Sequence, residues 1–246
     1  MSGHNKWSTI KRKKGANDAK RSKIFSKIIK EITIAVKESG PDADANPRLR
    51  LAIANAKGAS MPKDNIERAI NKGKDKDGST FVEYTFEGYL PHGIAAYVEC
   101  TSDNQQRTVS NVRSIFNKYS GNLGTNGSLS FMFDRKGVFT IPLGDLDQDE
   151  FELEMIDAGA EDLEVEESFV TVTTAMEDFG TLMKKLDELA IEPESAELRR
   201  IPKDTTTLSL EDSKKVMKII ESFEEDDDVQ NVFHNMELTD ELVDSM

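Results

Sequence analysis

The chain has 246 residues, which is enough for one large domain or for two to three small ones. Its 37% hydrophobic and 32% charged residues are typical of folded domains and exclude an intrinsically disordered chain. Residues 1–76 carry a net charge of +11, whereas residues 77–246 carry −25. This division favours a polyanion-binding module attached to an acidic body over a by-product of selection for solubility.

The single cysteine, Cys100, excludes an internal disulfide and favours a reducing compartment. No apolar run reaches the roughly 18 residues that a membrane span requires. Lys27, Lys30 and Glu31 interrupt the place where a secretory signal would have its apolar core. Lys outnumbers Arg in this region, which argues against a mitochondrial presequence. We therefore expect a cytoplasmic protein with no membrane partner.

Three helices are predicted within residues 1–76. Apolar residues spaced three and four apart between Ile24 and Val36 predict the first helix. Asn46, followed by Pro47, predicts the start of a second helix, and a third runs from near Pro62 to Gly73. The polar residues that follow predict a linker. The expected unit is a basic helical domain over residues 1–76.

A second domain is expected from residues 80–133 together with residues 205–246. The first part predicts a strand over 82–87, a turn over 88–93, a strand over 94–101, a helix capped by Asp103 or Asn104, and a strand over 129–133. The second part predicts a helix opened by Ser209 and a strand over 229–234. That last strand lacks a partner in the intervening segment, so we expect it to return to the earlier strands.

The intervening residues 134–204 predict the order βαββαβ of the ferredoxin-like split pattern. Asp147, with Glu150 three residues later, opens its first helix, and a helix over 179–189 separates its last two strands. The expected fold class is α+β, with an N-terminal three-helix domain and two small α+β domains, the third inserted into the second.

No constellation typical of an enzyme is found. The three histidines and Cys100 lack metal-ligand spacing, and an apolar strand predicts that Cys100 is an inert core thiol. The acidic run 224–228 predicts a solvated loop rather than a cation site. The glycine-rich loop 121–127 lacks the Lys and Ser/Thr of a phosphate loop, so it predicts turns and bulges. We expect no catalytic residue, metal, cofactor or small-molecule substrate.

The basic N-terminal arm is the strongest candidate for a binding site, because Lys and Arg neutralise phosphates. Its candidate contacts are Lys6, Trp7, Lys11, Arg12, Lys13, Lys14, Lys20, Arg21, Lys23, Lys27 and Lys30. Trp7 either stacks on an exposed base or packs the arm onto the helices. Met61, Pro62 and Lys63 form a candidate tip contact, although Met61 also fits a hydrophobic staple. No base-reading motif is evident, which favours contacts to the phosphate backbone.

Several motifs resemble the YebC family, also known as the YebC/PmpR family. They are Gly3-His-Asn-Lys-Trp7, Asp18-Ala-Lys-Arg21, Phe25-Ser-Lys27, Asn46-Pro-Arg-Leu-Arg50, Met61-Pro-Lys63, Glu87-Gly-Tyr89, Ser102-Asp-Asn104, Arg107-Thr-Val109, Gly121-Asn-Leu-Gly124 and Ala158-Gly-Ala-Glu-Asp162. Ser120 departs from the paired glycines expected before Asn122. The resemblance implies three domains and a cytoplasmic, DNA-binding transcriptional regulator. A protein related to this family is a mitochondrial translational activator of cytochrome oxidase, and members are also described as ribosome-associated factors that relieve stalling at proline runs. The resemblance therefore also implies a role in translation.

Two functions therefore stay open, both without enzymatic activity. The first is a DNA-binding transcriptional regulator of the YebC family. The alternative is a translation factor that binds ribosomal RNA on the ribosome, which the acidic body favours because extended DNA would repel it.

Overall fold

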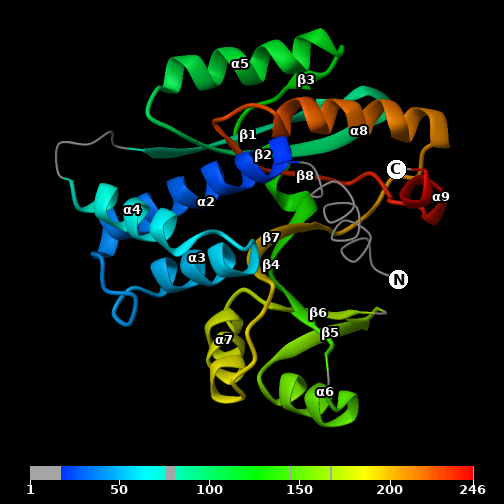
Figure 1. Ribbon diagram of the computed structural model, residues 1–246. Coiled ribbons are helices and arrows are strands. Elements are labelled where there is room, and N and C mark those ends of the chain that lie inside the picture. Colours follow the sequence, from blue (N-terminus) through cyan, green and yellow to red (C-terminus); the bar gives the residue numbers. More distant parts are fainter. Residues whose placement is uncertain (1–17, 76–80, 145, 167, 246) are drawn as a thin grey trace. The chain divides into compact units, whose positions relative to one another are not determined.

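The computed structural model describes residues 18–75, 81–144, 146–166 and 168–245 (Figure 1). Helices accompany two separate four-stranded antiparallel sheets, so the predicted α+β class is confirmed. The described residues form two compact units: residues 28–75 with 135–200, and residues 18–27 with 81–134 and 201–245. The boundaries that we predicted for three domains stay a prediction.

The first unit begins with the predicted helices, which are α2 (Asp18–Ser39, whose first residues belong to the second unit), α3 (Pro47–Gly58) and α4 (Lys63–Lys74). Asn46 caps α3 as predicted, because its Oδ1 accepts a hydrogen bond from Leu49 N. Its Nδ2 donates to the carbonyls of Ala35 and Gly40, which ties the end of α2 to the start of α3. One buried amide thus joins two helices.

The predicted end of the third helix at Gly73 is wrong by one residue. Gly73 lies inside α4 and is buried against α2, where an added Cβ would lie 2.6 Å from Val36 Cβ. Glycine is therefore needed here for the close approach of two helices and not to end one.

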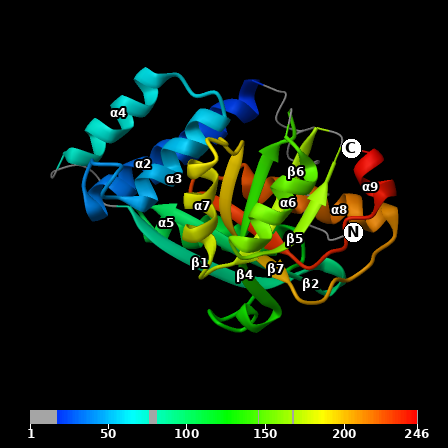
Figure 2. The same cartoon turned by 90° about the horizontal axis from the view of Figure 1, so that it is seen from below.

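The first unit also contains most of sheet B, in the strand order β5-β6-β4-β7. Its elements are β4 (Phe133–Pro142), α6 (Gln148–Asp157), β5 (Ala160–Val165), β6 (Phe169–Ala175), α7 (Phe179–Glu188) and β7 (Ser195–Pro202). β6 separates β4 from β5, so the predicted ferredoxin-like split pattern is confirmed. Helices α6 and α7 share one core with β4 and β6 (Figure 2).

Helix α3 is joined to the edge strand β7 by Asn55. Its Oδ1 accepts from Ala196 N and its Nδ2 donates to Ala196 O, both at 2.9 Å. The side-chain amide therefore takes the place of a paired strand at this residue. At the end of α3, an added Cβ at Gly58 would lie 1.9 Å from Glu194 O, so only glycine permits this approach.

Sheet A belongs to the second unit and has the strand order β3-β1-β2-β8. The elements of this unit are β1 (Val82–Leu90), β2 (Ile94–Ser102), α5 (Gln105–Lys118), β3 (Asn122–Leu123), α8 (Leu210–Glu224), β8 (Val229–His234) and α9 (Asp240–Asp244). β8 pairs with β2, so the predicted return of the last strand is confirmed. Asn104 and Ser209 cap α5 and α8, also as predicted.

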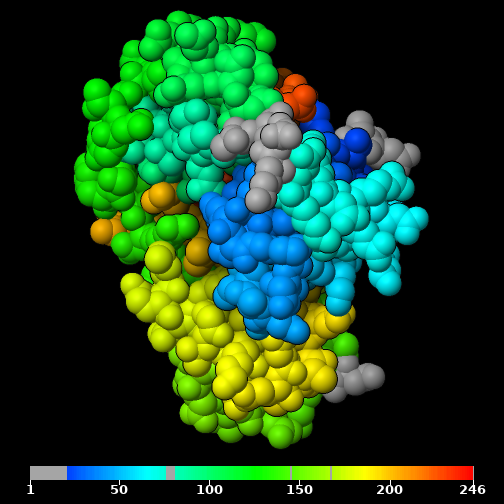
Figure 3. Space-filling model, turned by 90° about the vertical axis from the view of Figure 1, so that its left-hand side faces the viewer, coloured from blue at the N-terminus to red at the C-terminus, as the bar shows by residue number. Residues whose placement is uncertain are grey.

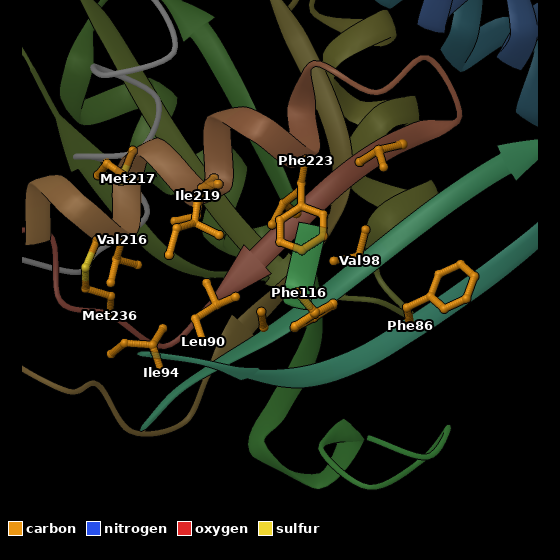
Figure 4. Packing of buried hydrophobic residues seen from close by; sticks show 14 of the residues in the cluster. Phe86, Leu90, Ile94, Val98, Phe116, Val216, Met217, Ile219, Phe223 and Met236 are labelled. Atoms are coloured by element: carbon orange, nitrogen blue, oxygen red, sulfur yellow. The ribbon is translucent and has the colours of Figure 1, made fainter. Parts of the chain in front are cut away.

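The core of the second unit lies between sheet A and these two helices. Phe116 of α5 and Phe223 of α8 are fully buried against strand residues such as Phe86 and Leu90 (Figure 4). The rings of Phe116 and Phe223 meet edge to face, with 5.0 Å between their centroids.

Two predicted elements of sheet A are wrong. The turn predicted over residues 88–93 contains only Pro91–Gly93, because β1 continues through Gly88 to Leu90. The strand predicted over 129–133 is instead the 3-10 turn η2 (Ser130–Met132), and β3 is the edge strand. Strand β3 can pair with β1 because Gly88 has no side chain: an added Cβ there would lie 2.5 Å from Asn122 O.

Candidate nucleic-acid interface

Most of the predicted basic arm cannot be placed. Lys6, Trp7, Lys11, Arg12, Lys13 and Lys14 lie outside the described residues. Lys20 lies in α2, but its side chain is outside the described part as well. Arg21, Lys23, Lys27 and Lys30 are the members of the arm whose surroundings the structure describes.

Two of these lysines bind to the second unit itself. Lys23 Nζ donates to Glu225 O at 2.7 Å, and Lys27 Nζ donates to Gln230 O at 3.1 Å. Glu225 is the C-cap of α8, so the Lys23 ammonium lies at the negative end of that helix. In this structure both lysines join α2 to the end of α8 and the start of β8.

The other two described members of the arm differ in exposure. Arg21 is exposed, and its guanidinium lies 5.5 Å from the centroid of the Phe25 ring in a cation–π contact. Lys30 is half-buried. Arg21 is thus the described residue of the arm best placed to meet a phosphate.

The predicted tip divides into a buried and an exposed part. Met61 is only 6% exposed and belongs to the core, whereas Pro62 and Lys63 are exposed. The interpretation of Met61 as a packing residue therefore fits the structure, and the part of the tip that a partner can reach is Pro62 with Lys63.

Helix α4 carries further cations that the sequence reasoning missed as site residues. Arg68 and Lys72 are exposed and lie four residues apart, which places them on one face of the helix. Neither forms an ion pair with any residue that the structure describes. Lys63 lies 3.7 Å from Glu67, an exposed pair of little energetic value. The sequence signal that could have identified Arg68 and Lys72 as candidate contacts is the i, i+4 spacing of two basic residues on an amphipathic helix.

Other basic residues of the helical region are used internally. Arg48 bridges Glu31 and Glu38, with Nε 2.7 Å from Glu31 Oε1 and Nη1 2.9 Å from Glu38 Oε2. Arg50 donates to the carbonyls of Ala43 and Asp44 in the preceding loop. The net charge of residues 1–76 therefore overstates the number of cations that are available to a ligand.

The prediction that the acidic run 224–228 is a solvated loop is wrong for Asp228. Its buried carboxylate accepts two hydrogen bonds from the Arg107 guanidinium and one from the Thr108 hydroxyl. Burial alone would raise the pKa of Asp228, but the hydrogen bonds from Arg107 and Thr108 outweigh it and hold that pKa below its usual value. This carboxylate joins the start of α5 to the loop before β8, and it has a structural role.

Nothing in the described part of the chain forms a metal centre, since no three His, Cys, Asp or Glu side chains converge there. Cys100 is buried in β2, as predicted for a core thiol. Among the described helices, none combines the length and the apolar character that crossing a bilayer requires.

Comparisons with known proteins identify the family. Residues 5–76 match the model of the TACO1/YebC protein N-terminal domain, and residues 81–236 match the model of the TACO1/YebC second and third domain. A "probable transcriptional regulatory protein" of Amoebophilus asiaticus is 54% identical over 239 residues, which cover 96% of this chain and 98% of the relative. A protein of the same name from Geotalea uraniireducens is 50% identical over the full length of both chains.

A solved structure agrees with these sequence matches. The crystal structure of a conserved hypothetical protein from Aquifex aeolicus superposes with a TM-score of 0.81 at 41% identity, covering 91% of this chain and 93% of that one. The predicted resemblance is therefore confirmed, and the chain belongs to the TACO1/YebC family.

Proposed function

We propose that the protein is a non-enzymatic, cytoplasmic regulator of gene expression that binds nucleic acid through residues 1–76. The observation that carries this proposal is the charge division, +11 on residues 1–76 against −25 on the remainder. Exposed Arg21, Lys63, Arg68 and Lys72 supply cations for phosphate contacts. Such contacts give affinity that falls steeply with salt but carry no sequence information.

Double-stranded DNA is the first candidate partner, and transcription the first candidate process. The relatives from Amoebophilus asiaticus and Geotalea uraniireducens are named as transcriptional regulators, which supports this choice. The acidic remainder of the chain limits the area that can lie along a duplex, so residues 1–76 would carry the contact.

Titration of the full-length protein into labelled duplex DNA tests the proposal. The charge reversal Arg68→Glu with Lys72→Glu should weaken binding at least tenfold and lower the salt slope by about 0.9 per lost phosphate contact. The matched control is Lys214→Glu with Lys218→Glu, an exposed pair of the same spacing on α8. Equal affinities for the two double variants would exclude α4 from the contact.

Promoter fragments must also bind more tightly than scrambled DNA of the same length at physiological salt. Equal affinity would exclude a sequence-specific transcriptional regulator, although a nucleic-acid-binding role would survive that result.

A translation factor that binds ribosomal RNA is the second candidate. The net charge of −25 on residues 77–246 favours it, because a shaped RNA site brings fewer phosphates near the acidic residues than extended DNA does. Sedimentation with ribosomes tests it. Changing Lys11, Arg12, Lys13 and Lys14 to Glu should abolish co-sedimentation, and unchanged co-sedimentation would exclude the arm.

A further inference from the structure

One segment of the acidic body contains no acidic residue. Residues 104–133 lack Asp and Glu entirely, although the average frequency of residues 77–246 would place about seven of them there. The charged residues of the segment are all basic, namely Arg107, Arg113 and Lys118. Carboxylates repel phosphates, so a surface without them is suited to contact with a polyanion.

The segment is also continuous in space within the second unit, because it wraps around one edge of sheet A. β3 forms that edge, and α5 packs on one face of the sheet through Val112 and Phe116. Residues 124–133 pack on the opposite face, where Leu129 and Phe133 meet Tyr97 of β2. Figure 3 shows the segment as the green surface at the top and upper left. We call the exposed part of residues 104–133, with the adjoining Tyr89, the acid-free surface.

The outer face of α5 is rich in amide and hydroxyl groups. The side chains that line a shallow hollow there include the amides Gln105, Gln106 and Asn117 and the cations Arg113 and Lys118. Arg113 forms no ion pair with a described residue. Lys118 Nζ lies 5.0 Å from the Tyr119 ring centroid, and the lysine remains exposed. Amides of Asn and Gln both donate and accept, as the edges of nucleobases do.

The loop on the other face presents aromatic side chains. Phe131 of η2 is 70% exposed, and Tyr89 of β1 is 42% exposed. Tyr89 Oη lies 4.0 Å from Met132 Sδ, beside η2. The buried carboxylate of Glu87 holds the loop, because its oxygens accept hydrogen bonds from Gly127 N and Leu129 N at 2.6 and 2.5 Å. Phe131 is therefore exposed on a loop that is fixed from beneath.

We propose that the acid-free surface binds unpaired nucleobases of a nucleic acid. Phe131 and Tyr89 stack on unpaired bases at one face of sheet A. The amides of α5 bond the edges of other bases at the opposite face, where Arg113 and Lys118 contact the backbone. Two cations are too few to hold a duplex by phosphate contacts, whereas stacking is worth about 5- to 150-fold in affinity per base and requires that the base is unpaired. The inference rests on the proposed function, since residues 1–76 supply the main affinity.

The experiment uses the full-length protein and labelled hairpins with an eight-nucleotide loop, in RNA and in DNA, each compared with a fully paired duplex of the same length. Phe131→Ala should weaken binding of a looped probe about tenfold and leave the duplexes unchanged. Leu153→Ala on α6 is the matched control, because Leu153 is 66% exposed and lies outside the surface. Loss confined to the RNA hairpin or to the DNA hairpin supports the proposal and identifies which nucleic acid supplies the bases.

Unchanged binding of both hairpins by Phe131→Ala and by Arg113→Gln with Lys118→Gln would overturn the inference. So would an equal loss for looped and paired probes, or photo-crosslinks from position 131 that reach only protein. Failure of this inference can be distinguished from failure of the proposed function, because different variants test the two. The Arg68→Glu, Lys72→Glu variant tests duplex binding, whereas Phe131→Ala tests the preference for a loop.

Discussion

The carboxylate of Glu87 offers a sharp test of how the loop of the acid-free surface is held. Glu87 is 1% exposed, and its two oxygens accept hydrogen bonds from the backbone N–H groups of Gly127 and Leu129. The substitution Glu87→Gln keeps the shape of the side chain but replaces one acceptor oxygen by a donor NH2 group. That group then faces a backbone N–H, and neither can be satisfied.

The expected cost follows from the number and kind of hydrogen bonds. A hydrogen bond to a charged group contributes about 1.5–3 kcal/mol, so the lost bond accounts for about 2 kcal/mol. The remaining bond changes from charge-assisted to neutral and loses about half of its strength, or about 1 kcal/mol. The sum of about 3 kcal/mol corresponds to roughly 100-fold more frequent opening of residues 124–133.

Amide hydrogen exchange read by mass spectrometry measures this opening. Peptides that cover residues 124–133 should exchange about 100-fold faster in Glu87→Gln than in the wild type. Glu83→Gln is the matched control, because it removes the same charge from an exposed position on the same strand. The reasoning would be refuted if the loop exchanged at the same rate in both variants.

Three other predictions concern stability. Asp228→Asn should cost about 2 kcal/mol at pH 7, because the buried charge that Arg107 binds is lost. The pKa of Asp228 in the folded protein lies below the unfolded value of 3.8, so this stabilisation is present above pH 3.8 and disappears as the pH falls through the folded pKa. The urea midpoints of the variant and the wild type should therefore differ at pH 7 and converge at a pH below the folded pKa. Gly58→Ala should destabilise by about 1–3 kcal/mol through the backbone clash at the end of α3, whereas Gly180→Ala, with open space around it, should not; equal melting temperatures would contradict this. Phe139→Ala should cost about 3–5 kcal/mol in thermal unfolding because it empties the centre of the sheet B core, and a loss below about 1 kcal/mol would contradict that packing.

Much of the fold could be predicted because its signals are local. The caps Asn46, Asn104 and Ser209 act on backbone groups three residues away, so a short stretch of sequence defines where each helix begins. The order of elements in residues 134–204 was sufficient to predict a ferredoxin-like sheet, since few topologies satisfy that order. The charge division likewise needs no coordinates.

The errors in the predicted strands arose where a distant residue decides the conformation. Leu129, Phe131 and Phe133 alternate as a strand would, but Glu87 draws the amides of residues 127 and 129 into hydrogen bonds and produces a turn with Phe131 outside. The edge of the sheet is taken by β3 because Gly88 leaves space for it. Neither effect is visible within a short window of sequence.

The candidate site shows the same division between sequence and tertiary structure. The sign of the charge in each part of the chain follows from the sequence alone, as does the family resemblance that the comparisons confirmed. Which cations are available to a ligand depends on the folded chain. Lys23 and Lys27 donate to carbonyls about 200 residues away and Arg48 is paired, whereas Arg68 and Lys72 stay exposed. Charge is a property of the residue type, whereas the availability of a charged side chain depends on the partners that folding brings to it from distant parts of the chain.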